Sequence, residues 1–125
     1  MDNNELDIKA CTEYKRDVGM ATIDKFFDMF SYPTADIDTQ PIREKSKELY
    51  AAFLRMTVGK YSGRRPRIPA AACIYLMAIH MGHHVTQDQI RKILSVSAVS
   101  ISQWYRIVLH ETRDDYPELQ DTILI

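Results

Sequence analysis

Residues 70–79 read Ala-Ala-Ala-Cys-Ile-Tyr-Leu-Met-Ala-Ile, and no charged side chain interrupts them. A helix that is apolar on all sides is normally buried on all sides, and its alanines allow neighbouring helices to approach closely. Pro69 suits the first turn of such a helix, and Gly82 suits its end. The stretch therefore predicts the central helix of an all-α domain, with the other helices packed around it.

Two longer helical patterns precede this segment. Residues 5–32 carry apolar side chains at the spacing i, i+3, i+4 and i+7, with a break or bend expected at Gly19. Residues 42–58 carry one apolar stripe and a charged outer side. The core positions expected from these patterns are Ile23, Phe26, Phe27 and Phe30 in the first helix, and Leu49, Ala52, Phe53 and Met56 in the second.

Two short helices with a small turn between them follow the central segment, at residues 86–94 and 98–110. Thr86 and Gln89 have the spacing of a capping box at the start of the first helix, and Ser97 is the expected N-cap of the second. Such a pair is a helix-turn-helix pattern, although any α-helical bundle can contain a similar hairpin.

In DNA-binding proteins the second helix of this motif enters the major groove, and its first residues meet the base edges. Gln can read adenine, Ser can bond to either base type, and Arg can read guanine or hold a phosphate. The outward candidates on the second helix are Ala98, Ser100, Ser102, Gln103 and Arg106.

The formal net charge of −1 conceals an uneven distribution. Residues 60–110 hold seven basic side chains against one acidic side chain, whereas both ends of the chain are acidic. A local basic excess is the electrostatic footprint expected of a nucleic-acid binder, but it can equally be a solvated surface. The further candidates for DNA contact are Arg64, Arg65 and Arg67 in the loop before the central helix, and Gln87, Arg91 and Lys92 in the first helix of the pair.

Trp104 and Ile107 are apolar at positions that face outward in this arrangement. We favour packing of both against the N-terminal helix or the C-terminal tail. The alternative is a protein interface that docks a partner or a second copy of the chain, because exposed aromatic residues favour interfaces.

Motifs for catalysis, cofactor binding or metal binding do not stand out. There is no Gly-rich phosphate loop, G-x-S-x-G or H-E-x-x-H. His80, His83 and His84 lie near the end of the central helix, where a positive charge is favoured, and they lack the further ligands that a zinc site needs. We expect no enzyme activity, no cofactor and no metal.

The two cysteines form no C-x-x-C pair, and neither a signal peptide nor a membrane span is evident. We therefore expect a reducing compartment, which is the cytoplasm for an archaeal protein and the nucleus for a eukaryotic one, with no secretion and no membrane contact.

Four motifs and a tyrosine follow one another in a regular order over residues 24–109. They are Gly-Arg-Arg-Pro at 63–66, Ala-Ala-Ala-Cys-Ile-Tyr-Leu at 70–76, Thr-Gln-Asp-Gln-Ile at 86–90, Val-Ser-Ala-Val-Ser-Ile at 96–101, and Tyr105. This series resembles the cyclin-like repeat of transcription initiation factor IIB and of its archaeal counterpart, transcription factor B, and it is most similar to the second of their two repeats.

The resemblance implies a five-helix cyclin-like bundle, here with an extra N-terminal helix, and a role at promoters. It implies that residues 98–106 and the loop at 64–67 face double-stranded DNA, and that the TATA-binding protein or other transcription machinery is a partner. The family carries two repeats, whereas this chain has room for one. The family also carries a zinc ribbon with four Cys or His ligands, whereas Cys11 is the only such residue in the first 40 positions here. A single-repeat regulator, monomeric or homodimeric, is therefore the expectation, with a docking module that does not touch DNA as the alternative.

We expect one domain over residues 1–125. It divides into a helical extension at 1–32, a core repeat at 42–110 with the helix-turn-helix at 86–110, and a tail at 111–125.

Overall fold

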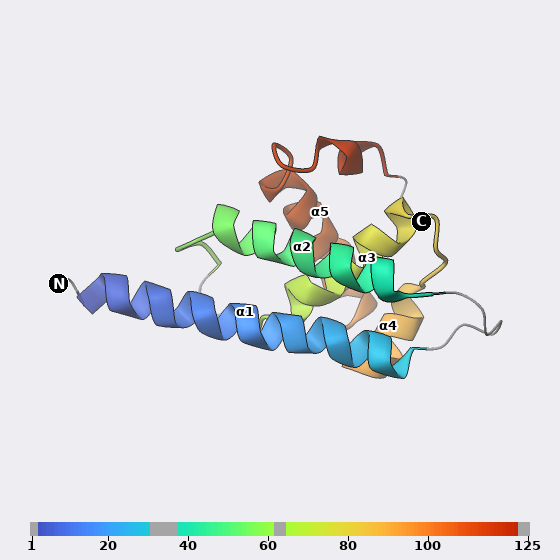
Figure 1. Ribbon diagram of the computed structural model, residues 1–125, viewed down its shortest axis with the longest axis horizontal. Coiled ribbons are helices and arrows are strands. Elements are labelled where there is room, and N and C mark those ends of the chain that lie inside the picture. Colours follow the sequence, from blue (N-terminus) through green and yellow to red (C-terminus); the bar gives the residue numbers. More distant parts are fainter. Residues whose placement is uncertain (1–2, 31–37, 62–64, 123–125) are drawn as a thin grey trace.

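A computed structural model describes residues 3–30, 38–61 and 65–122, with side chains from residue 10 onward. Five α-helices and one 3₁₀ helix, and no strand, occur in these ranges, so the predicted all-α fold is confirmed (Figure 1). The elements are α1 (Asn3–Met29), α2 (Gln40–Met56), α3 (Arg67–His80), α4 (Gln87–Leu94), α5 (Ala98–Glu111) and the 3₁₀ helix η1 (Pro117–Asp121). No helix in the described ranges is long and apolar enough to cross a membrane.

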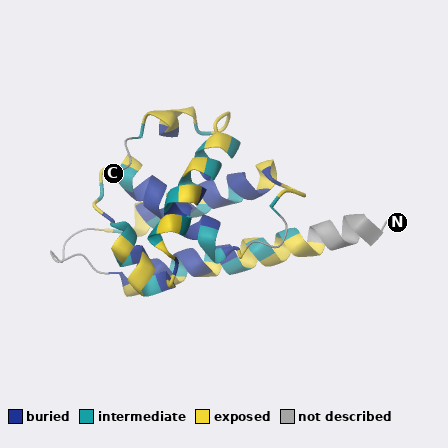
Figure 2. Cartoon of the chain, turned by 180° about the vertical axis from the view of Figure 1, so that it is seen from behind, coloured by how far each residue is buried: buried dark blue, intermediate teal, exposed yellow. Residues whose placement is uncertain are grey.

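Helix α3 is the centre of the bundle, as its sequence predicts. Every residue from Pro69 to Ala78 is buried, and α1, α2, α4 and α5 all contact this helix. Figure 2 shows the buried residues on the inner sides of the helices and the exposed ones on the outer sides. The helix begins at Arg67, two residues before the expected start, so that Pro69 still lies in the first turn, where its missing N–H leaves no hydrogen bond unmade.

Helix α1 runs through Gly19 without a break, so the predicted interruption at this residue is wrong. The glycine serves packing instead, because a Cβ atom added there would overlap the ring of Tyr50. The Tyr50 hydroxyl donates a hydrogen bond to the Lys15 carbonyl, with 2.7 Å between the oxygens. Since α1 contacts α2, α3 and α4, it is one of the five helices of the bundle.

The core positions predicted for the first two helices are confirmed with one exception. Met56, the last residue of α2, is 37% exposed, so its predicted place in the core is wrong. The chain turns away from the helix at this point, and Thr57 is buried in its stead. The Thr57 hydroxyl donates to the Phe53 carbonyl at 2.6 Å, which satisfies the buried group.

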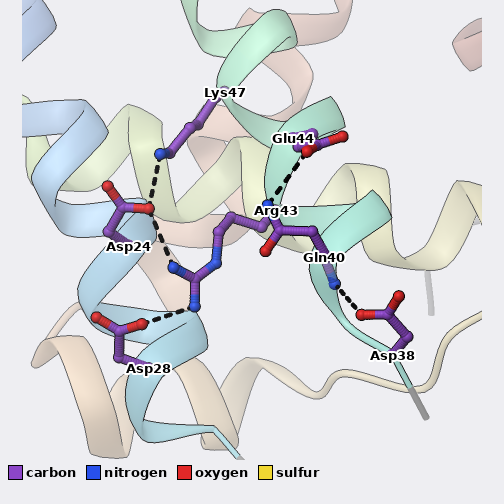
Figure 3. A network of polar contacts seen from close by, with 7 residues as sticks. All are labelled: Asp24, Asp28, Asp38, Gln40, Arg43, Glu44 and Lys47. Carbon is purple, nitrogen blue, oxygen red and sulfur yellow. Dashed lines mark hydrogen bonds and ion pairs between the residues drawn. The ribbon is translucent and has the colours of Figure 1, made fainter.

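A small charged network joins α1 to α2 (Figure 3). Asp24 accepts from Lys47 at 2.7 Å and from Arg43 at 3.3 Å, and Arg43 also reaches Asp28 at 2.7 Å. The Arg43 guanidinium lies 5.9 Å from the centre of the Phe27 ring. Because Arg43 is mostly covered, this network holds the two helices in one register more firmly than an exposed pair would.

A second polar contact ties the segment after α2 to the end of α5. The Glu111 carboxylate accepts from the Tyr61 hydroxyl at 3.0 Å and from Lys60 Nζ at 3.2 Å. Partial burial raises the pKa of Glu111, but the hydrogen bonds from Tyr61 and Lys60 outweigh it and leave the pKa below its ordinary value. Partial burial, together with the hydrogen bond to Glu111, raises the pKa of Tyr61.

Candidate nucleic-acid interface

The capping box predicted at the start of α4 is present. The Thr86 hydroxyl accepts from the Gln89 N–H at 3.1 Å, and the Gln89 side chain accepts from the Thr86 N–H at 2.8 Å. These two bonds satisfy backbone donors that a helix start leaves open. Ile90 and Leu94 are buried on the inner side of α4, so its opposite side faces solvent.

Three residues, 95–97, connect α4 to α5. Ser95 adopts the left-handed conformation, with φ at 57°, and its N–H donates to the Arg91 carbonyl at 2.8 Å. Val96 is buried and anchors the connection. Ser97 is the N-cap of α5, as predicted, because its hydroxyl accepts from the Ser100 N–H at 3.1 Å.

The solvent-facing side of α5 carries a row of side chains. Ile101, Trp104 and Val108 are buried, whereas Gln103 and Arg106 are exposed. Val99 is 67% exposed and lies four residues before Gln103, so that it shares this face. Sequence reasoning missed Val99, although its spacing from Gln103 and Arg106 was sufficient to place it there.

The other predicted positions on α5 are less exposed, and two of them are engaged in hydrogen bonds. Ala98 and Ser100 are half-buried, and Ser100 is engaged with the N-cap. Ser102 accepts a hydrogen bond from Gln87 Nε2 at 3.1 Å, a contact that links α5 to α4. The structure therefore brings Gln87 and Ser102 together, but their side chains form a hydrogen bond with each other, which makes them less available for a contact with DNA.

The basic side chains of α4 share one carboxylate. Arg91 and Lys92 both reach Asp88, at 2.6 and 3.2 Å. The hydrogen bonds from Arg91 and then Lys92 hold the pKa of Asp88 below its ordinary value. The positive charge expected on this helix is therefore partly neutralised within it.

Arg65 lies two residues before α3 and Arg67 is its first residue, and both line a hollow together with residues of α1. Arg65 is exposed, and Arg67 is half-buried. Arg64 lies outside the described residues.

Trp104 is only 7% exposed, so its suggested role as an exposed docking residue is wrong. Its ring centre lies 5.4 Å from that of Tyr61 and 6.3 Å from that of Phe53. The ring therefore packs within the chain, but its aromatic partners come from α2 and the segment after it, whereas the favoured interpretation named the N-terminal helix or the C-terminal tail. Ile107 is half-buried and packs against the core.

Among the histidines near the end of α3, His80 has a neighbour within the chain. His80 Nδ1 lies 3.1 Å from the Thr122 hydroxyl, within hydrogen-bond distance. Across the described ranges, no three His, Cys, Asp or Glu side chains are grouped so as to hold a metal ion.

Comparison with known families identifies a matching family model. The family model described as transcription factor TFIIB repeat matches residues 17–111, about three quarters of the chain. Searches of the curated proteins and of the solved structures find no significant match. The match covers α1 from Asp17 onward and all of α2 to α5, the five helices of a cyclin-like bundle. This family consists of transcription factors and not of enzymes, and it implies work with DNA and the transcription machinery in general. The chain belongs to the transcription factor TFIIB repeat family.

Proposed function

We propose that this protein is a transcription regulator that binds duplex DNA, with α4 and α5 acting as a helix-turn-helix and α5 as its recognition helix. It acts by binding and not by catalysis. The observation that carries the proposal is the exposed row on α5 that is formed by Val99, Gln103 and Arg106.

The chemistry of this row suits the edges of base pairs. A glutamine amide can pair with adenine, an arginine can pair with guanine or hold a phosphate, and an apolar side chain can pack on the methyl group of thymine. An α-helix with its side chains is about 10–12 Å across, which matches the roughly 12 Å width of the major groove. The net positive charge of residues 60–110 supplies the attraction to phosphates.

A protein-docking function for the same surface has less support. The aromatic residue that favoured it, Trp104, is in the core, and the exposed row on α5 is mostly polar. Docking without DNA contact is therefore an outcome of the test and not a second proposal.

The test is a fluorescence anisotropy titration with a mixed pool of labelled duplexes, at several salt concentrations, followed by selection of the preferred sequence. We expect binding that weakens steeply with salt. Gln103→Ala should relax the preference at one base pair, and Arg106→Ala should weaken binding as well.

The matched control is Arg55→Ala, which removes one positive charge from α2, where Arg55 pairs with Asp115. It should leave both affinity and preference nearly unchanged. Absence of binding at about 50 mM salt, or equal losses in Arg106→Ala and Arg55→Ala, would overturn the proposed function.

A further inference from the structure

A hollow of about 390 Å³ lies between α1, the start of α3 and the end of α4. Three positively charged side chains line it, and they come from distant parts of the sequence. They are Lys25 of α1, and Arg65 and Arg67 at the start of α3. Of the side chains that the structure describes, no acidic one lines this space.

These three cations lack the carboxylate partners that most of the other basic residues have. Most of the other described Lys and Arg side chains lie within ion-pair distance of a carboxylate. Lys25, Arg65 and Arg67 have no such neighbour among the described residues. The Nε atom of Arg67 is also buried without a hydrogen-bond partner, which is a costly arrangement for a charged group.

The backbone adds to the positive character of the hollow. Arg67 is the first residue of α3, a helix of 14 residues with no acidic side chain in its first turn. The start of a helix carries partial positive charge, so an arginine there is disfavoured and an anion is favoured. The backbone at the start of α3 and the three side chains therefore all favour an anion in the hollow.

We propose that this hollow binds a phosphate group, and that its occupant is a backbone phosphate of the duplex held by α5. The identity of the occupant rests on the proposed function, whereas the anion chemistry rests on the hollow alone. Leu94 lines the hollow at the end of α4, and the three-residue connection into α5 begins at the next residue. The site therefore adjoins the helix pair, and it makes α1 part of the DNA-binding surface.

The remaining lining fits a sugar-phosphate chain. Val18 is apolar and half-buried and gives a deoxyribose a surface on which to pack, while the cations meet the phosphate. Phosphate contacts position a protein on DNA without reading its sequence. The hollow should therefore raise affinity equally for all duplexes.

The first experiment measures the salt dependence of DNA affinity in Lys25→Ala and Arg65→Ala. Both side chains are exposed, and unchanged far-ultraviolet circular dichroism would verify that the variants fold. Each should lower the slope of log affinity against log salt by about 0.9, the value for one lost phosphate contact, without altering the preferred sequence.

Arg16→Ala is the matched control, because Arg16 lies on α1 but on the other side of the helix. Tyr14 lines the hollow, and a residue two positions away on a helix points in nearly the opposite direction. Arg16 pairs with Asp17, and its removal should leave the slope unchanged. Slopes that stay at the wild-type value in Lys25→Ala and Arg65→Ala, or that fall equally in Arg16→Ala, would overturn the site while leaving the proposed function in place.

The second experiment separates the hollow from DNA binding. Inorganic phosphate is titrated into the ¹⁵N-labelled chain, and the amides of Thr22 and Leu94, which line the hollow, are followed by NMR. Saturable shifts that disappear in Lys25→Ala would support the anion site even if the chain binds no duplex, and would then assign it to free phosphate compounds. No shift, together with no loss of DNA affinity in Lys25→Ala, would overturn it.

Discussion

The contact between Gly19 of α1 and Tyr50 of α2 predicts that Gly19→Ala destabilises the protein, against the usual effect of this change. Replacing a glycine inside a helix with alanine normally raises the free energy of unfolding by about 1 kcal/mol. Here the new methyl group would overlap the Cε2, Cζ and hydroxyl atoms of Tyr50. The Tyr50 side chain is fully buried, so moving the ring aside would disturb its neighbours in the core.

The magnitude follows from three contributions. Overpacking of a buried contact costs about 1–3 kcal/mol, and displacing the hydroxyl from the Lys15 carbonyl loses about 1 kcal/mol more. The gain in helix propensity offsets about 1 kcal/mol of these two costs. We expect Gly19→Ala to lower the free energy of unfolding by about 1–3 kcal/mol.

Urea unfolding followed by circular dichroism measures this difference, and a second background isolates its cause. In Tyr50→Leu the ring is gone, so Gly19→Ala should stabilise that variant by about 1 kcal/mol through propensity alone. Ala21→Gly, at an exposed position of the same helix, calibrates the propensity. A Gly19→Ala protein that is as stable as the wild type, or a loss of the same size in the Tyr50→Leu background, would refute the reasoning.

Three further changes test other parts of the structure. Ser95→Gly should raise the free energy of unfolding by about 0.5–1 kcal/mol, because glycine adopts the left-handed conformation of Ser95 without strain; a less stable variant in urea unfolding would contradict this. Thr86→Ala should lower it by about 1 kcal/mol through loss of the N-cap bond, whereas Thr86→Ser should not, and equal melting temperatures for both variants would show that the cap contributes nothing. The lowered pKa of Glu111 means that its hydrogen-bonded carboxylate stabilises the protein above the ordinary carboxyl pKa and that this contribution is lost as the pH falls through the folded-state pKa. Glu111→Gln should therefore reduce the difference in stability between pH 7 and acidic pH, and an unchanged difference across a series of urea titrations would count against the contact.

Much of the candidate interface was accessible from local sequence patterns. Gln103 and Arg106 were placed on the outer face of their helix by its period, and both are exposed. Val99 could have been found by the same count. The sharing of Asp88 by Arg91 and Lys92 is a contact between residues three and four positions apart, which the helical period also allows.

Other features depend on contacts between residues that are far apart in the sequence. Trp104 was placed correctly within the chain but with the wrong neighbours, because helical periodicity gives a direction and not a partner. Its neighbours, Phe53 and Tyr61, are set by how α2 and α5 cross α3. The cationic hollow joins Lys25 to Arg65 and Arg67, and no spacing in the sequence indicates that meeting.

The sequence by itself determined that this chain is a helical bundle built around residues 70–79, because an uncharged segment of that length has to be buried. It also determined the starts of α4 and α5, because their caps are bonds between residues three positions apart. Only the tertiary structure decided that α1 runs through Gly19 without a break and lies close against Tyr50, and that Lys25 shares a hollow with Arg65 and Arg67. Periodicity tells which side of a helix is buried, whereas the approach of two helices depends on how all their side chains pack together.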